Sequence, residues 1–228
     1  MNKPIERLQI VQKTIKKACL AAGRDPREVA LLAVSKKQSP ENIITFNNLG
    51  IFAFGENQVQ EALQKQKELE HLDLEWHFIG AIQSNKTHAI AEHFQWVQSV
   101  DRERILRRLA SQRRADSPPL NVCLQVNIDH EVQKGGATPE EILQLASLCG
   151  GLDNIKLRGL MAIPKMTTDP GEQHDSFRRV RLLYEELLAR GFLVDTLSMG
   201  MSADLEIAIQ EGSTMVRIGT DLLGKRKT

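Results

Sequence analysis

Two cationic side chains stand where the sequence is otherwise apolar. Lys36 closes the apolar run "LLAVSK" (31–36), and Arg217 lies in the middle of Val216–Ile218. A lysine at the end of a buried strand either extends its ammonium along the apolar surface to solvent or is kept inside for the chemistry of its amine. Arginine cannot lose its charge in a protein, so Arg217 needs a partner, either a carboxylate such as Glu56 or a ligand.

Two loops late in the chain have the composition of an anion site. One is "SMGMSADLE" (198–206), in which Ser202 is a candidate helix N-cap, and the other is "RIGTDLLG" (217–224). The hydroxyls of Ser202 and Thr220 can donate to a phosphate, and Gly219 allows the backbone to approach it closely. A simpler interpretation is also open, in which Ser202 only caps a helix and Gly219 only turns the chain.

The alternation of short apolar runs with longer amphipathic ones predicts the fold that would bring these residues together. Eight runs have the length and composition of strands: Val29–Ser35, Ile51–Phe54, Trp76–Ile79, Trp96–Val100, Asn121–Asn127, Leu157–Ile163, Thr196–Met199 and Met215–Ile218. After an N-terminal amphipathic helix, further helices are expected to begin near Pro40, Gln58, Asn85, Arg102, Pro139, Gly171 and Ala203. This order predicts an α/β protein with a single (β/α)8 barrel, and an open doubly wound sheet is the alternative.

A barrel would place the amine, the anion site and the arginine at one end, because active sites of barrels lie where the strands end. Together the three features suit an aldehyde that carries a phosphate. Pyridoxal 5′-phosphate (PLP) meets this description, since a lysine can hold it as a Schiff base and an arginine can face its pyridine nitrogen. A lysine-dependent barrel aldolase acting on a phosphosugar would use the same groups.

Seven ordered motifs carry a resemblance to a known family. They are "LLAVSK" (31–36), "FGENQVQE" (54–61), "WHFIG" (76–80), "QSNK" (83–86), "LRGLMAIP" (157–164), "LSMGMSADLEIAI" (197–209) and "GSTMVRIGTDLLG" (212–224). The chain resembles the YggS/PROSC family of pyridoxal phosphate homeostasis proteins, whose barrel is similar to the N-terminal domain of alanine racemase. The resemblance implies that Lys36 forms the Schiff base, that Arg217 lies near the ring nitrogen, and that Ser202, Gly219 and Thr220 bind the phosphate.

Three further residues are implied by the same resemblance. Ser198 neighbours the phosphate contacts, Asn57 lies beside the cofactor, and Met161 lines its ring. Simpler interpretations are that Asn57 caps a helix with Gln60 completing a capping box, and that Met161 packs in the core. His77, between Trp76 and Phe78, is expected to be a core histidine.

The sequence departs from the family pattern at two places. Ala81 stands where a proline is expected in "IGAIQ" (79–83), and Lys37 is a second lysine where a small polar residue is more usual. A shift of the strand by one residue would turn Lys37 inward in place of Lys36, because adjacent side chains face opposite ways. The motif alignment favours Lys36.

The resemblance implies a carrier rather than an enzyme. A racemase needs a base on each face of the substrate carbon, and in the related enzyme the second base is a tyrosine supplied with a separate β-domain. Here the chain stops after strand eight, and the only tyrosine, Tyr184, lies in a helix expected on the outer ring. A cation at Arg217 would also oppose protonation of the ring nitrogen, which weakens the electron sink. We therefore expect a non-catalytic protein that limits free PLP and passes it to apo-enzymes, with an amino-acid racemase and the aldolase as alternatives.

Composition sets the remaining expectations. Lys+Arg 30 against Asp+Glu 29 leaves a net charge of +1, so no overall field recruits nucleic acid or an anionic membrane. The three cysteines form no CxxC pair, the histidines have no metal spacing, and no apolar leader or membrane-length segment is present, which predicts a cytoplasmic protein. No linker divides the 228 residues, and no apolar stripe is obvious, so we expect one domain and a monomer.

Overall fold

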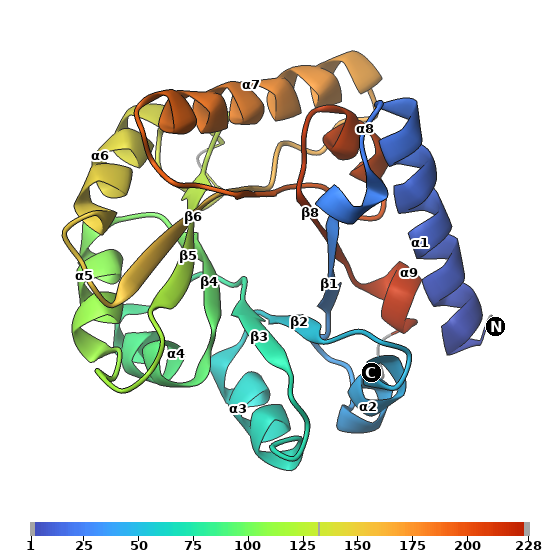
Figure 1. Ribbon diagram of the computed structural model, residues 1–228, viewed down its shortest axis with the longest axis horizontal. Helices are drawn as coiled ribbons and strands as arrows, with labels where there is room; N and C mark the ends of the chain where they lie inside the picture. The colour runs from blue at the N-terminus through green and yellow to red at the C-terminus, as the bar shows by residue number, and fades with distance from the viewer. Residues whose placement is uncertain (1–2, 132, 226–228) are drawn as a thin grey trace.

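Eight parallel strands close into a barrel in the computed structural model, which describes residues 3–131 and 133–225. They are β1 (Ala30–Val34), β2 (Ala53–Glu56), β3 (Glu75–Phe78), β4 (Trp96–Val100), β5 (Leu120–Val126), β6 (Ile155–Ala162), β7 (Thr196–Ser198) and β8 (Met215–Ile218). Each strand pairs with the next one along the chain, and β8 returns to pair with β1 (Figure 1). The closed ring confirms the (β/α)8 barrel and rules out the open doubly wound sheet.

Helices surround the barrel on all sides (Figure 1). They are α1 (Pro4–Ala21), α2 (Pro40–Asn47), α3 (Val59–Glu68), α4 (Thr87–His93), α5 (Glu103–Gln112), α6 (Pro139–Cys149), α7 (Pro170–Ala189), α8 (Leu205–Gln210) and α9 (Thr220–Leu223), with 3-10 turns η1 (Pro26–Glu28) and η2 (Ser84–Lys86). Prolines open α2 and α6, where the side chains of Ser39 and Thr138 accept the first free N–H groups. Such local signals explain why these helix starts could be predicted.

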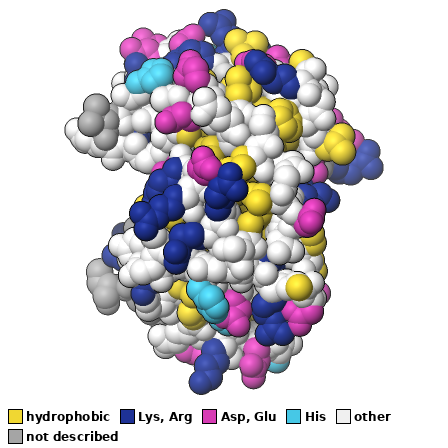
Figure 2. All heavy atoms as spheres, turned by 90° about the vertical axis from the view of Figure 1, so that its left-hand side faces the viewer, with side chains coloured by type: hydrophobic (Ala, Val, Ile, Leu, Met, Phe, Trp, Pro, Cys, Tyr) yellow, Lys and Arg dark blue, Asp and Glu magenta, His cyan; other side chains and the backbone are white. Residues whose placement is uncertain are grey.

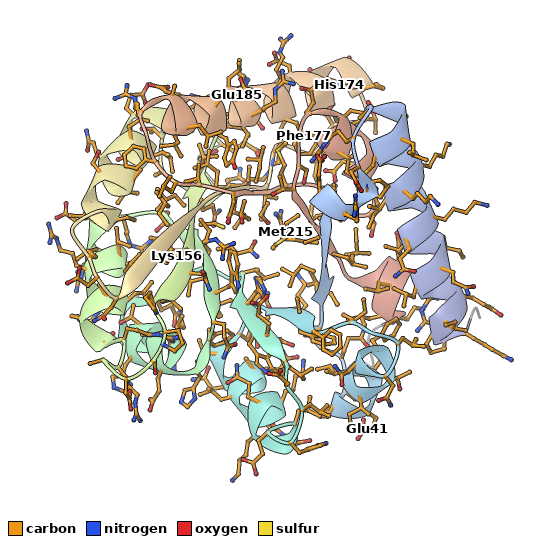
Figure 3. All side chains as sticks on the ribbon, in the orientation of Figure 1. Glu41, Lys156, His174, Phe177, Glu185 and Met215 are labelled. Carbon is orange, nitrogen blue, oxygen red and sulfur yellow. The ribbon has the colours of Figure 1, made fainter. Side chains whose placement is uncertain are left out.

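The buried apolar side chains of the described residues form two clusters. The larger one fills the space between the barrel and the helices and includes Phe46, Phe54 and Phe177, all essentially buried. The smaller one, formed by Trp96, Cys123 and Met161, is a separate cluster. Figure 3 shows Met215 near the centre of the ring of strands.

The second strand differs most from its prediction. Ile51 belongs to the turn that ends α2, because its N–H donates to the carbonyl of Phe46, and the strand runs from Ala53 to Glu56. The predicted strand did not include Glu56 because a charged residue does not belong to an apolar run. Its carboxylate is buried nonetheless, and the reason lies in its partners, which are described below.

The surface carries no dominant charge on the face formed by α5 and α6. Figure 2 shows acidic and basic side chains intermingled there, with a group of Lys and Arg near the middle. Among the described residues, no helix is both long enough and apolar enough to cross a membrane.

Candidate functional site

Lys36 lies in the turn that follows β1, two residues beyond the end of the strand rather than at it. Its neighbour Ser35 is buried, and the Ser35 hydroxyl donates to Glu56 Oε1 at 2.6 Å. Lys36 is half-buried, whereas Lys37 is exposed and adopts a left-handed backbone conformation with φ 59°.

The chain after β8 runs beside the chain after β1. The strands pair in register, with Leu32 opposite Arg217. A Cβ on Gly219 would lie 3.6 Å from the carbonyl oxygen of Val34, and farther on Gln38 Nε2 donates to the Gly224 carbonyl at 3.0 Å. The fold thus brings the turn of Lys36 next to Gly219 and the start of α9 at Thr220.

The loop after β7 reaches the same end of the barrel. The Arg217 N–H donates to the Gly200 carbonyl at 3.0 Å, so the chain leaving β7 stays beside β8. Gly200 has φ 96°, and a Cβ there would lie 2.6 Å from the Cβ of Ala208, so a glycine is required. Ser202 is exposed in the turn that follows.

The prediction that Ser202 caps the next helix is wrong. Helix α8 begins at Leu205, and Asp204 occupies the N-cap position. The Asp204 carboxylate accepts the Met201 N–H at 2.5 Å, and the Asp204 N–H donates back to the Met201 carbonyl at 3.1 Å. Because residues 201–204 form this turn, the helix begins only at Leu205. The Ser202 hydroxyl is therefore available at the mouth of the barrel.

Arg217 is buried, and its guanidinium donates to carbonyl and hydroxyl oxygens rather than to a carboxylate. Its Nη1 donates to the carbonyl and hydroxyl oxygens of Ser198 at 2.7 and 2.9 Å, and its Nη2 donates to the Ala162 carbonyl at 2.9 Å. Burial lowers the pKa of Arg217 to about 10, partly opposed by the charge of Asp204, so the group stays cationic at neutral pH. The alternative of an ion pair with Glu56 is wrong, because that carboxylate pairs with Lys65.

Ser198 connects Arg217 to a chain of polar side chains. Its hydroxyl donates to Gln98 Oε1 at 2.6 Å, Gln98 Nε2 lies 2.9 Å from His77 Nδ1, and His77 Nε2 lies 2.8 Å from Glu75 Oε1. Burial lowers the pKa of His77, so the ring is neutral and accepts at Nδ1. His77 is a satisfied core histidine, as expected, while Gln98 was overlooked although an amide inside "WVQSV" (96–100) is an available signal.

Met161 is fully buried, and its cluster partners Trp96 and Cys123 come from neighbouring strands. The sheet register places Met161 directly opposite Ser198 on β7. Met161 is therefore one strand away from the residue that holds Arg217, which is compatible with both core packing and a ring contact.

Asn57 follows β2 and is half-buried. It lines a cavity of about 290 Å³, together with Gln60, Phe78 and Lys86 among others. The predicted capping box is wrong, because α3 begins at Val59 with Gln58 as its N-cap. The Asn57 carbonyl instead packs against Gly80, where a Cβ would approach it to 2.3 Å. Ala81, which stands in the expected proline position, lines the same cavity.

One end of the barrel therefore combines an amine, two exposed hydroxyls, a glycine beside the end of β1 and a buried cation. These groups can bind a phosphorylated aldehyde by condensation, by hydrogen bonding to its anion and by a cationic contact to a neutral acceptor. In the described part of the chain, no three His, Cys, Asp or Glu residues are grouped so as to hold a metal ion.

Comparison with known proteins gives consistent results. A family model described as "Alanine racemase, N-terminal domain" matches residues 19–227. The pyridoxal phosphate homeostasis protein of Pseudomonas aeruginosa is 54% identical over 226 residues, covering 99% of this chain and 97% of that protein. The protein of the same name from Haemophilus influenzae is 47% identical over 223 residues, covering 96% and 94%.

Solved structures agree with these matches. PipY of Synechococcus elongatus with PLP bound is 34% identical and superposes with a TM-score of 0.83, covering 97% of this chain and all of PipY. The alanine racemase of Clostridium difficile is only 12% identical, with a TM-score of 0.77 over 95% of this chain and 56% of its own length. The second likeness shows a shared barrel fold.

Proposed function

Because the chain belongs to the family of pyridoxal phosphate homeostasis proteins, we propose that it binds PLP and takes part in the homeostasis of this cofactor. The observation that carries the proposal is the meeting of three features at one end of the barrel. Lys36 follows β1, Gly219 and Thr220 follow the adjacent β8, and Arg217 lies buried between Ser198 and Ala162. Lys36 suits an aldehyde, Gly219 and Thr220 suit a phosphate, and Arg217 suits a pyridine nitrogen.

The residues present fit PLP chemically. Arg217 has oxygen partners but no carboxylate partner among its hydrogen bonds, so its charge favours a neutral ring nitrogen facing it. Ser202 and Thr220 are exposed at the mouth and offer hydroxyl donors to a phosphate, which strengthens hydrogen bonds by its charge. Asn57, Met161 and Ser198 complete the set of proposed contacts.

Lys36 is the residue proposed to hold the cofactor covalently. Its amine adds to the aldehyde carbon, and loss of one water leaves a C=N bond, the Schiff base. The reaction is reversible, so an amine on another protein can take over the aldehyde. We propose that this exchange, rather than turnover of a substrate, delivers PLP to apo-enzymes.

Two features support holding over catalysis. When bound, PLP supplies an electron sink whose strength depends on protonation of the ring nitrogen, and Arg217 opposes that protonation by like-charge repulsion. Tyr184, the one tyrosine of the sequence, donates its hydroxyl to the Val194 carbonyl at 3.0 Å and contacts the Gly159 backbone from α7. It is placed outside the strands, away from Lys36.

The test is reduction of the PLP-loaded protein. Borohydride should trap PLP on Lys36, which mass spectrometry of the peptides would identify, and Lys36→Ala should lose the visible absorption band while keeping its circular dichroism. Lys37→Ala is the matched control and should keep the band. Loss of the band in Lys37→Ala but not in Lys36→Ala would reverse the assignment of the two lysines.

A further inference from the structure

A buried ion cluster lies directly behind the turn that carries Lys36. Lys65, on α3, is 4% exposed, and its ammonium donates to Glu56 Oε1 at 2.8 Å, to Glu61 Oε1 at 2.6 Å and to the Ser35 carbonyl at 2.8 Å. An ammonium has three protons to donate, so Lys65 is fully satisfied. The cluster joins β2 and α3 to the end of β1.

The same carboxylates bind the residues on both sides of Lys36, one through a side chain and one through the backbone. On the N-terminal side, the Ser35 hydroxyl donates to Glu56 Oε1 at 2.6 Å. On the C-terminal side, the Lys37 N–H donates to Glu61 Oε1 at 2.5 Å. Lys36 thus projects from a turn whose two flanking residues are fixed by charged side chains from other elements.

The turn needs this support because it is strained. Lys37 has φ 59°, a left-handed conformation that a side chain with a Cβ rarely adopts. A charge-assisted hydrogen bond from its N–H to Glu61 compensates for that conformation locally. Without this bond, the backbone at Lys37 could relax to a right-handed or extended conformation, and the direction of Lys36 would change.

Stability alone is a weak reason for such a cluster. Burial raises the pKa of Glu56, and the positive charge of Lys65 opposes that rise. Buried ion pairs often contribute no more than apolar residues of the same size would, because desolvation offsets their attraction. The geometry of the cluster, which reaches the backbone at both neighbours of Lys36, points to a role in orientation.

We propose that Glu61 is a positioning residue that directs the Lys36 amine toward the aldehyde of PLP, with Lys65, which is itself anchored by Glu56, holding the Glu61 carboxylate in place. The inference rests on the proposed function, in that Lys36 is taken as the amine that binds the aldehyde. Glu61 itself contacts the Lys37 N–H and Lys65 and does not act on the cofactor directly.

The experiment compares two ligands in three variants. Pyridoxamine 5′-phosphate has the ring and phosphate of PLP but an amine in place of the aldehyde, so it cannot condense with Lys36. Glu61→Ala should weaken PLP binding roughly tenfold, the effect of losing about one hydrogen bond to a charged group, and should leave pyridoxamine 5′-phosphate binding within about twofold of wild type. Glu61→Gln keeps an oxygen acceptor for the Lys37 N–H and should restore most of the PLP affinity.

Glu68→Ala, at an exposed position of the same helix, is the control and should change neither affinity. Equal weakening of both ligands by Glu61→Ala, or no weakening of either, would overturn the positioning role. If Glu61→Ala does not fold, the comparison is made in Ser35→Ala, because that variant removes the hydrogen bond on the other side of Lys36. It should weaken PLP binding more than pyridoxamine 5′-phosphate binding, and an equal effect on the two ligands would overturn the positioning role. Failure of the proposed function would look different: wild type itself would then bind PLP no more tightly than pyridoxamine 5′-phosphate.

Discussion

Arg217 shows how a single residue can decide the chemistry of a site. Its guanidinium donates to three oxygens of Ser198 and Ala162, none of them negatively charged, and burial lowers its pKa to about 10, which leaves it cationic at neutral pH. A carboxylate in the same place would favour a protonated ring nitrogen, whereas this cation disfavours it. If Arg217 faces the ring nitrogen as proposed, its charge favours binding of the cofactor over activation of it.

The buried thiols of Cys123 and Cys149 allow the packing around them to be tested by a change of pH. Burial raises the pKa of Cys123 and of Cys149 to about 12, against about 8.5 in an unfolded chain. Above about pH 8.5 the folded state therefore keeps thiol protons that the unfolded state loses. The contribution of the protonated thiols to the free energy of unfolding is complete below about pH 8.5 and is lost as the pH rises toward 12.

Urea unfolding between pH 8 and pH 10 should show the free energy of unfolding falling by up to about 1.4 kcal/mol per pH unit for each thiol. The control is Cys123→Ala/Cys149→Ala, in which the fall should be much shallower. Equal slopes in the two proteins would show that the thiols are not held protonated by the fold.

Among the elements, the loops after β7 and β8 give the sharpest prediction about ligand choice. If Ser202, Gly219 and Thr220 bind the phosphate, pyridoxal should bind far more weakly than PLP, because each hydrogen bond to a charged group contributes roughly 1.5–3 kcal/mol. Ser202→Ala/Thr220→Ala should weaken PLP binding at least tenfold and leave pyridoxal unaffected, as measured by titration of the absorption spectrum. Ser147→Ala, exposed on α6, is the control, and equal wild-type affinity for the two ligands would contradict the phosphate site.

Elements with local signals were predictable, and those set by tertiary contacts were not. Strands β4 and β8 and helix α6 begin where the apolar runs and the Thr138–Pro139 start indicate. Helix α8 begins two residues after the predicted start near Ala203, because Asp204 rather than Ser202 occupies the N-cap position. The selection of Asp204 depends on the Met201 N–H and on the path of Gly200 beside β8, neither of which is visible in the sequence.

The candidate site shows the same division. The motifs predicted Lys36, Arg217, Gly219 and Thr220 as site residues, and the barrel register explains why residues from opposite ends of the chain meet. The cluster of Lys65, Glu56 and Glu61 was not foreseen, because a buried charge in a short strand looks like a solvent-exposed position until its partner on the next helix is known.

The molecule as a whole separates Lys36 from Tyr184, the residue of the type that supplies the second base in the related racemase. Lys36 lies at the end of the barrel, while Tyr184 packs between α7 and the outside of β6, with its hydroxyl committed to Val194. Burial raises the pKa of Tyr184, which further disfavours the phenolate that would accept a proton. Tyr184 would therefore not reach an amino acid bound through PLP at Lys36, and under the proposed function we expect no proton exchange from both faces.

Incubation of the PLP-loaded protein with L- or D-alanine should therefore change its absorption spectrum as the amino acid displaces Lys36, yet leave the enantiomer unchanged. Chiral chromatography together with α-deuterium exchange in D₂O measures this, with Lys36→Ala as the blank. An apo-enzyme mixed with the loaded protein should meanwhile gain activity as the absorption band of this protein falls. Racemisation that depends on Lys36 at ordinary enzyme rates, on the order of 1 s⁻¹ or faster, would contradict the carrier function and require a second base close to the amine.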